Sequence, residues 1–314
     1  MVKVTSKKIL TVYIISAILL LLYVLSQTIF SSRGQKKAYS QKIVFIHEAD
    51  IPNIDGFIIN NADSELIISK AEDMWLVSSS ENPQNRIPAD TQKLKTLFLS
   101  LATTRTISKA GSKTNLSAYG LDAQNNYIIA IYKKGTLYQN LIFGDLDFSQ
   151  TQRYFTDDEL NSVFYYDTSF DTFLTASVLS WCDPYIISSQ LKDSVFNTGD
   201  IQSASTYDYA EKKGCALTPE NENWTQSISK LLELRHGGFT TEADVIQTQD
   251  YNILTKIQLE TGNLVKITLE IYETQVPEEF NVKTIFFSEL SGKEFSYNTA
   301  ISLWTYNKIK EIML

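Results

Sequence analysis

The sequence predicts an α+β fold in which an N-terminal transmembrane helix is followed by two tandem strand-rich modules. Each module is expected to be an antiparallel sheet with one main amphipathic helix. Three observations predict this arrangement: residues 9–30 are apolar and uncharged, runs of alternating apolar and polar residues recur after them, and the order of these runs in the first half returns in the second. A chain of 314 residues is also long enough for two domains of ordinary size.

The composition is that of a folded, acidic protein. Hydrophobic residues make up 43% and charged residues 20%, and the 12% of aromatic residues favours strands. The formal net charge is −8, but residues 1–37 contain only basic groups, so the remaining chain has 22 Lys and Arg against 36 Asp and Glu. A body with that excess of negative charge repels phosphate backbones, which argues against nucleic acid as a partner.

The N-terminal apolar stretch, "ILTVYIISAILLLLYVLSQTIF" at residues 9–30, is expected to span a membrane. At about 1.5 Å per residue it reaches roughly the thickness of a hydrocarbon core. A buried core helix would show a polar stripe, which this stretch lacks. A cleaved signal peptide has a shorter apolar region, of about 7 to 15 residues, and a small-residue cleavage site. An uncleaved anchor is therefore favoured over both alternatives.

The charges that flank the anchor do not decide its orientation, because three basic residues precede it and three follow it: Lys3, Lys7, Lys8, Arg33, Lys36 and Lys37. A short N-terminal tail before a long polar body usually stays in the cytoplasm. We therefore expect residues 1–8 to be a cytoplasmic tail and residues 31–45 to be a juxtamembrane linker. The body beyond the linker is expected to be extracytoplasmic.

The first module is assigned to residues 46–180. Alternating runs predict strands in "GFIINN", "ELIISKA" and "MWLVSSS", and Pro88 and Asp90 are typical of a helix start. The helix "TQKLKTLFLSLATT" follows, with its apolar residues on one face. Two hairpins complete the module, one around Lys134 and Gly135 and one around the acidic residues 157–159.

The second module is assigned to residues 181–314 and repeats this order. Trp224 precedes the helix "TQSISKLLELR", and "KIQLETGNLVKITLEIYE" is expected to form a hairpin with Gly262 in its turn. The segment "KEFSYNTAISLWTYN" is expected to form the next hairpin, in which Phe295 corresponds to Phe155. "VPEEFNVKTIFFSEL" has no counterpart and is assigned to an extra strand or a longer connection. The alternative to duplication is that two α+β modules share this order by chance.

The two histidines are not expected to bind a metal. His47 begins the segment "HEAD", which lacks the second histidine of a zinc helix, so a solvated polar turn is favoured. His236 precedes Gly237 and Gly238, where an imidazolium would suit the end of a helix.

The cysteines Cys182 and Cys215 leave two possibilities open. In an extracytoplasmic body they could form a disulfide that closes a loop of about 34 residues. The alternative is two buried free thiols.

Acidic clusters provide no clear catalytic or metal-binding motif. Residues 145–147 ("DLD") and 157–159 ("DDE") lack the register of a calcium loop, and "GSKTNLSAYG" lacks the ending of a phosphate loop. Asp157, Glu159 and Asp183 are candidates for a hydrolase only by residue type. The sequence therefore predicts no catalytic, cofactor-binding or metal-binding residue and no cofactor.

The first half resembles the bacterial family known as domain of unknown function DUF4340. The residues that carry the resemblance are a Trp with a hydrophobic pair, a Pro-Ala-Asp helix start, a Tyr-Gly-Leu-Asp turn, a glycine after a strand and an aromatic residue before the last hairpin: Trp75, Leu76, Val77, Pro88, Ala89, Asp90, Tyr119, Gly120, Leu121, Asp122, Gly144 and Tyr154. The resemblance covers residues 55–180 well and the second half, which lacks the Tyr-Gly-Leu turn, only loosely. It implies a membrane-tethered extracytoplasmic protein without known catalytic residues, and some members are associated with ABC-type export systems.

The expected function is that of a non-enzymatic, single-pass protein of the bacterial cell membrane. It would be anchored in the membrane by residues 9–30 and would act as an extracytoplasmic scaffold or accessory subunit of a membrane complex. The partner that the resemblance implies is an ABC-type exporter. The alternative is a tethered module that binds a ligand or glycan in an aromatic-lined cleft near Trp181 or Trp224. A hydrolase would need carboxylates that converge from both modules.

Overall fold

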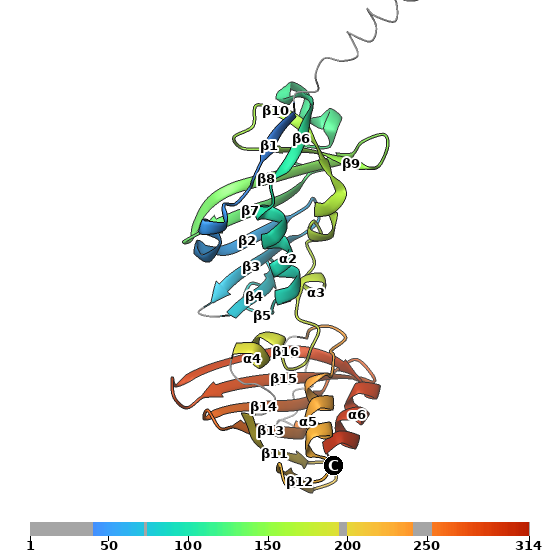
Figure 1. Ribbon diagram of the computed structural model, residues 1–314. Helices are drawn as coiled ribbons and strands as arrows, with labels where there is room; N and C mark the ends of the chain where they lie inside the picture. Colours follow the sequence, from blue (N-terminus) through green and yellow to red (C-terminus); the bar gives the residue numbers. More distant parts are fainter. Residues whose placement is uncertain (1–39, 72–73, 195–199, 241–252, 314) are drawn as a thin grey trace, which may run out of the picture.

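The computed structural model describes residues 40–71, 74–194, 200–240 and 253–313, and these form a strand-rich protein with two antiparallel sheets (Figure 1). The predicted anchor at 9–30 and the tail at 1–8 lie outside the described residues. Within the described ranges, no helix has the length and hydropathy that crossing a bilayer requires. The first described element, strand β1, lies inside the stretch 31–45 that the sequence assigned to a linker.

The first sheet has ten strands in the order β1-β6-β10-β9-β8-β7-β2-β3-β4-β5, and every neighbouring pair is antiparallel. Helix α2 (Thr91–Ala102) lies on this sheet, and the short helices η1 (Glu48–Asn53) and η2 (Lys113–Tyr119) join strands at its edges. The strands are β1 (Ser40–Ile43), β2 (Ile54–Asn60), β3 (Glu65–Ala71), β4 (Met74–Ser79), β5 (Ile87–Pro88), β6 (Arg105–Ser112), β7 (Tyr127–Lys133), β8 (Thr136–Leu146), β9 (Gln152–Asp157) and β10 (Ser162–Asp167).

The second sheet has six antiparallel strands in the order β12-β11-β13-β14-β15-β16. Helices α5 (Trp224–Leu232) and α6 (Leu303–Met313) pack together beside it. The strands are β11 (Ile201–Asp208), β12 (Lys213–Leu217), β13 (Ile253–Thr261), β14 (Val265–Glu273), β15 (Glu279–Ser288) and β16 (Lys293–Ser302).

Helix α2 begins where the sequence predicted. The carboxylate of Asp90 accepts hydrogen bonds from the backbone N–H groups of Gln92 (2.8 Å) and Lys93 (3.1 Å), which satisfies two donors that a helix start leaves unpaired. Its face toward the sheet buries Leu94, Leu97 and Leu101. The prediction of this helix and of its N-cap is therefore confirmed.

The predicted hairpin at 127–144 is also confirmed. Lys134 and Gly135 both have positive φ, at 51° and 73°, as the tight turn between β7 and β8 requires. In the corresponding hairpin of the second sheet, the residue with positive φ is Leu264 (57°), not Gly262. Gly262 instead donates its N–H to the carbonyl of Asp200.

The prediction for the last part of the chain was wrong. The segment "KEFSYNTAISLWTYN" is one strand, β16, followed by the start of α6, and not a hairpin. The partner of β16 is β15, which occupies the segment that had been assigned to an extra strand or connection. Phe295 therefore pairs with Phe286, so it is on a strand that follows β15 and does not correspond to Phe155 on β9.

The two sheets share one succession of strands. In the first, β2 pairs with β3 on one side and with β7 on the other, and β8, β9 and β10 follow in sequence. In the second, β11 pairs with β12 and β13, and β14, β15 and β16 follow in the same way. The main helix stands between the initial hairpin and the four-strand run in both, as α2 and as α5. The first sheet adds β1, β4, β5 and β6 to this pattern.

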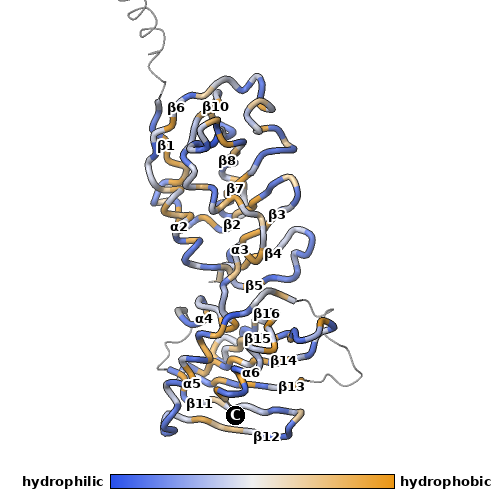
Figure 2. The backbone as a smooth tube through the Cα atoms, turned by 90° about the vertical axis from the view of Figure 1, so that its right-hand side faces the viewer, coloured by the Kyte–Doolittle hydropathy of each residue, from blue (hydrophilic) through white to orange (hydrophobic). Residues whose placement is uncertain are grey.

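The molecule is elongated, with the two sheets end to end and α4 (Ser189–Ser194) between them in both views (Figures 1 and 2). Strands β1, β6 and β10 lie near one end and β12 lies at the other. Apolar segments concentrate on the strands and the long helices, whereas the turns are mostly hydrophilic (Figure 2). The buried apolar side chains of both sheets and of the segment between them form one continuous core.

Candidate functional site

The segment that joins the two sheets, residues 168–194, is called the connector here. It contains η3 (Thr168–Phe173), α3 (Val178–Trp181) and α4. On one side, Cys182 forms a β-bridge with Ala89 next to β5. On the other, Tyr185 forms a β-bridge with Arg235 in the segment after α5. Backbone pairing therefore attaches the connector to both parts of the molecule.

Asp183 is buried in the middle of the connector and is held by local donors. Its carboxylate accepts hydrogen bonds from the N–H of Tyr185 (3.0 Å), the N–H of Ser189 (2.8 Å) and the hydroxyl groups of Ser188 and Ser189. Its backbone carbonyl is 2.6 Å from Nε2 of His236. A buried carboxylate with this many donors fixes the turn that leads into α4.

Gln190 attaches α4 to the edge of the first sheet. Its Nε2 donates to the carbonyls of Trp75 (2.7 Å) and Ala89 (2.9 Å), and its Oε1 accepts from the N–H of Trp75 (2.8 Å). The side chain is buried, so these bonds satisfy backbone groups of β4 that water does not reach.

The second sheet holds the connector through Tyr297 and Thr284. Both hydroxyl groups donate to the carbonyl of Ile186, at 2.8 and 3.1 Å, and the Tyr297 oxygen accepts from the N–H of Ser188. Complete burial raises the pKa of Tyr297 well above its ordinary value, so this hydroxyl remains a donor. Together with Gln190, these contacts fix the two sheets relative to each other.

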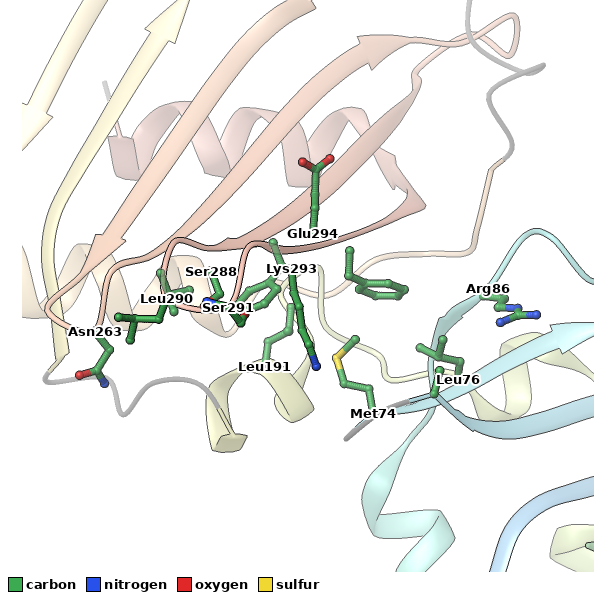
Figure 3. Close-up of a pocket in the computed structure, with 14 residues that line it drawn as sticks. Met74, Leu76, Arg86, Leu191, Asn263, Ser288, Leu290, Ser291, Lys293 and Glu294 are labelled. Atoms are coloured by element: carbon green, nitrogen blue, oxygen red, sulfur yellow. The ribbon is translucent and has the colours of Figure 1, made fainter. Parts of the chain in front are cut away.

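A cavity of about 800 Å³ opens beside this junction and is the candidate functional site (Figure 3). It lies over the part of the second sheet's inner face that α4 leaves uncovered, and the first sheet contributes the end of β3, β4 and Arg86 to its wall. The apolar wall consists of Ala71, Met74, Leu76, Leu191, Val265, Phe286, Leu290 and Phe295. Its volume and its mixed lining are those of an ordinary small-molecule site.

Polar groups stand around this apolar wall. Arg86 and Asn263 lie toward opposite ends of the cavity in Figure 3, with Met74 and Leu191 between them. The Lys293 side chain extends toward Met74, whereas the Glu294 carboxylate points away from the other labelled side chains (Figure 3). The arrangement can hold an elongated apolar group and a polar or charged end.

The histidines that the sequence singled out lie away from this cavity lining. His47 is exposed before η1, and Asp50 of the same "HEAD" segment accepts a hydrogen bond from Nζ of Lys133 at 2.6 Å, which lowers the pKa of Asp50. His236 is part of the junction, where burial lowers its pKa. The described ranges contain no group of three or more His, Cys, Asp or Glu side chains placed to hold a metal ion.

The two cysteines are free thiols in the structure. Cys182 is buried in the connector and Cys215 is half-buried on β12, at the far edge of the second sheet. Burial raises the pKa of Cys182 to about 11, so its thiol is less ionised than an exposed one at neutral pH. Of the two possibilities left open by the sequence, the structure has the free thiols.

The three carboxylates named as hydrolase candidates do not converge. Asp157 and Glu159 belong to the turn after β9 in the first sheet, where Oδ1 of Asp157 accepts from the N–H groups of Glu159 (2.9 Å) and Leu160 (2.6 Å). Asp183 belongs to the connector. Each aspartate thus serves the backbone of its own turn.

Trp181 and Trp224, which only the ligand-binding alternative placed near a cleft, are buried. The position of Trp181 beside Cys182 and Pro184 favours packing at the junction over stacking on a ligand, and this prediction is confirmed. Trp181 is completely buried in the connector, with its Nε1 donating to the carbonyl of Thr175 (2.8 Å) and the ammonium of Lys93 at 4.2 Å from its ring centroid. Trp224 is buried at the start of α5. The cavity between the sheets is aromatic, but Phe286 and Phe295 provide its rings.

Sequence reasoning missed the residues that line the cavity. The alternation in β15 places Phe280, Val282, Thr284 and Phe286 on one face, and it could have shown that this face is mostly apolar as far as Phe286. That α4 leaves this end uncovered depends on packing between distant segments. The strand pattern alone contains no signal for it.

The sequence matches the family described as Domain of unknown function (DUF4340) over residues 79–289, whereas no curated protein and no solved structure matches it. The matched segment starts at the end of β4, runs through the connector and ends just after β15. It therefore extends past residue 180, beyond which the resemblance in the sequence is only loose, and it includes strands of both sheets, but it leaves out residues 55–78, among them Trp75, Leu76 and Val77. Since the match covers more than half of the chain, this protein belongs to the DUF4340 family.

Proposed function

We propose that the chain is a non-enzymatic, single-pass membrane protein whose body lies outside the cytoplasm and acts as a scaffold or accessory subunit of a membrane complex. The proposed anchor is residues 9–30, and the proposed partner class is an ABC-type export system. The observation that carries this proposal is the junction: buried contacts from Asp183, Gln190 and Tyr297 hold two sheets as one elongated body. Such a body suits a rigid spacer or docking platform above a membrane.

The use of the buried polar groups supports a structural role. The carboxylates of Asp157 and Asp183 accept backbone N–H donors in their own turns. Asp208 is buried against the ammonium of Lys310 at 2.9 Å, which ties α6 to β11. These groups are engaged in holding the fold, so they are poor candidates for proton transfer to a substrate.

We further infer that the body consists of two versions of one module. The shared strand succession and the equivalent positions of α2 and α5 support this inference. The second version would then have lost or never acquired the strands that extend the first sheet at its two ends. A profile built separately from each half and compared with the other would test it.

The test of the scaffold role is co-purification of the full chain from its native membrane in a mild detergent. The proposal expects a stable partner that is itself a membrane protein. Two variants separate specific binding of a partner from incidental hydrophobic capture. Leu99→Glu and Phe148→Glu place a charge at apolar side chains that are 68% and 106% exposed, so they change the surface without changing the core. Recovery of the protein alone at every expression level would contradict the scaffold role.

The cavity between the sheets favours a second function, that of a tethered module which binds a small molecule. This function requires a saturable increase in thermal stability with some small ligand, because a compound that binds only the folded state raises the unfolding temperature. It does not require a protein partner, so the two functions are tested independently.

A further inference from the structure

We propose that the cavity between the two sheets binds a single-chain anionic amphiphile, such as a long-chain fatty acid, with its chain along the apolar wall and its carboxylate at Arg86. This proposal rests on the second function above, and it adds the chemical class of the ligand.

The shape and the lining of the cavity fit an alkyl chain. Its volume of about 800 Å³ falls within the range of sites that enclose molecules of drug size. The apolar wall runs from the end with Leu290 past Leu191 and Met74 to Leu76 near Arg86 (Figure 3). The flexible side chain of Met74 in this wall adapts its shape to an alkyl chain, and the half-buried rings of Phe286 and Phe295 add apolar surface.

The charge at one end of the cavity fits a carboxylate. Arg86 is exposed, its Nε donates to the carbonyl of Pro83 at 3.3 Å, and no described carboxylate forms an ion pair with it. A guanidinium binds a carboxylate through two parallel hydrogen bonds, and it does so better than an ammonium group. Glu294, an acidic residue among the described lining residues, points away from the other labelled side chains in Figure 3.

This local charge is opposite to that of the body as a whole. Beyond residue 37 the chain has 22 basic and 36 acidic residues, whereas Arg86 places a positive charge at one end of the described cavity lining. An acidic protein repels anionic ligands over most of its surface, so a local positive end guides them to one place. A neutral or cationic amphiphile would not gain binding free energy from an ion pair with Arg86.

Both sheets contribute to the site. Met74, Leu76 and Arg86 come from the first part of the molecule, and Val265, Phe286 and Phe295 come from the second. A bound chain would therefore contact both sheets and stabilise their junction, which predicts that the ligand raises the unfolding temperature of the whole body.

The test uses the full chain in phosphatidylcholine nanodiscs, with empty nanodiscs to subtract partitioning into lipid. The probe is a dansylated undecanoic acid, whose fluorescence reports entry into an apolar site, and the competitors are dodecanoate, dodecanol and dodecyltrimethylammonium. We expect saturable binding of one probe per chain and displacement by dodecanoate. We expect Arg86→Glu to weaken dodecanoate binding by at least about tenfold without weakening dodecyltrimethylammonium. The matched control Lys109→Glu removes an exposed positive charge from β6 and should leave all affinities within about twofold.

A second pair of variants tests the place of the alkyl chain. Ser288→Trp fills the cavity and should abolish probe binding, whereas Ser296→Trp places the same side chain on the exposed outer face of β16 and should not. The proposal is overturned if binding does not exceed that of empty nanodiscs, or if Arg86→Glu and Ser288→Trp bind dodecanoate as the unmodified chain does. Tight binding of dodecyltrimethylammonium without dodecanoate would also overturn it, while leaving the more general binding function intact.

Discussion

Asp183 determines the shape of the junction at the scale of a single residue. Its side chain is 2% exposed, and its oxygens accept from two backbone N–H groups and two serine hydroxyls. Asp183→Ala would leave these buried donors unpaired, so we expect the free energy of unfolding to fall by about 2 to 4 kcal/mol. Urea unfolding of the membrane-anchored chain in nanodiscs checks the value. Asp158, an exposed aspartate in the acidic turn at residues 157–159, is the control. Asp158→Ala should change the free energy of unfolding by less than about 0.5 kcal/mol.

His236 makes stability depend on pH. Burial lowers its pKa in the folded protein, whereas in the unfolded chain the pKa is about 6.5. Below pH 6.5 the unfolded chain therefore binds a proton that the folded chain does not, and stability falls as the pH decreases from about 6.5 toward the lowered folded pKa. His236→Gln should flatten the dependence of the unfolding temperature on pH in this window. A slope that survives this substitution would assign the dependence to other groups.

At the scale of elements, α4 is held to the first sheet by one side chain. Gln190→Leu keeps the approximate volume but removes the hydrogen bonds to the N–H and carbonyl of Trp75 and to the carbonyl of Ala89. The N–H of Trp75 and the carbonyl of Ala89 would lose their partner, whereas the carbonyl of Trp75 still accepts from the N–H of Ala89 at 2.8 Å. We therefore expect a loss of about 2 to 4 kcal/mol and faster hydrogen exchange at β4 and β5. The exposed Gln92 on α2 provides the control, because Gln92→Leu should leave the exchange of both strands unchanged. Equal exchange in the two variants would show that α4 does not hold this edge.

The sequence predicts individual helices and strands better than it predicts which of them pair or pack together. β3 has the predicted bounds, and α2 begins after Asp90 as expected, because periodicity and capping are local properties. The segment after β16 was misassigned because "ISLWTYN" alternates apolar and polar residues like a strand. Its continuation buries Tyr306, Ile309 and Met313 at helical spacing, which only the full length of α6 makes clear.

The cavity was beyond prediction for the same physical reason. Its walls come from β4, α4 and the β14–β16 region, and β4 lies more than a hundred residues before the other two in the chain. The ligand-binding alternative placed an aromatic-lined cleft near Trp181 or Trp224, whereas the rings that line the cavity are those of Phe286 and Phe295. Both tryptophans are buried in the structure.

At the scale of the whole molecule, an elongated body of two fixed sheets is proposed to stand beyond a membrane on the anchor at residues 9–30. The apolar core continues from the first sheet through the connector into the second, so a partner docked at one end would be held at a constant distance from the other. This arrangement has a function only if the body is on the outer side. The membrane side of the body is therefore the central claim.

Protease accessibility in intact cells tests that claim most directly. Cells or spheroplasts that produce the full chain are treated with proteinase K, and the body is followed with an antibody against the second sheet, beside a cytoplasmic protein as the control for intact membranes. The account predicts that the body is digested while the cytoplasmic control remains whole. A body that stays intact until the membrane is permeabilised would contradict it.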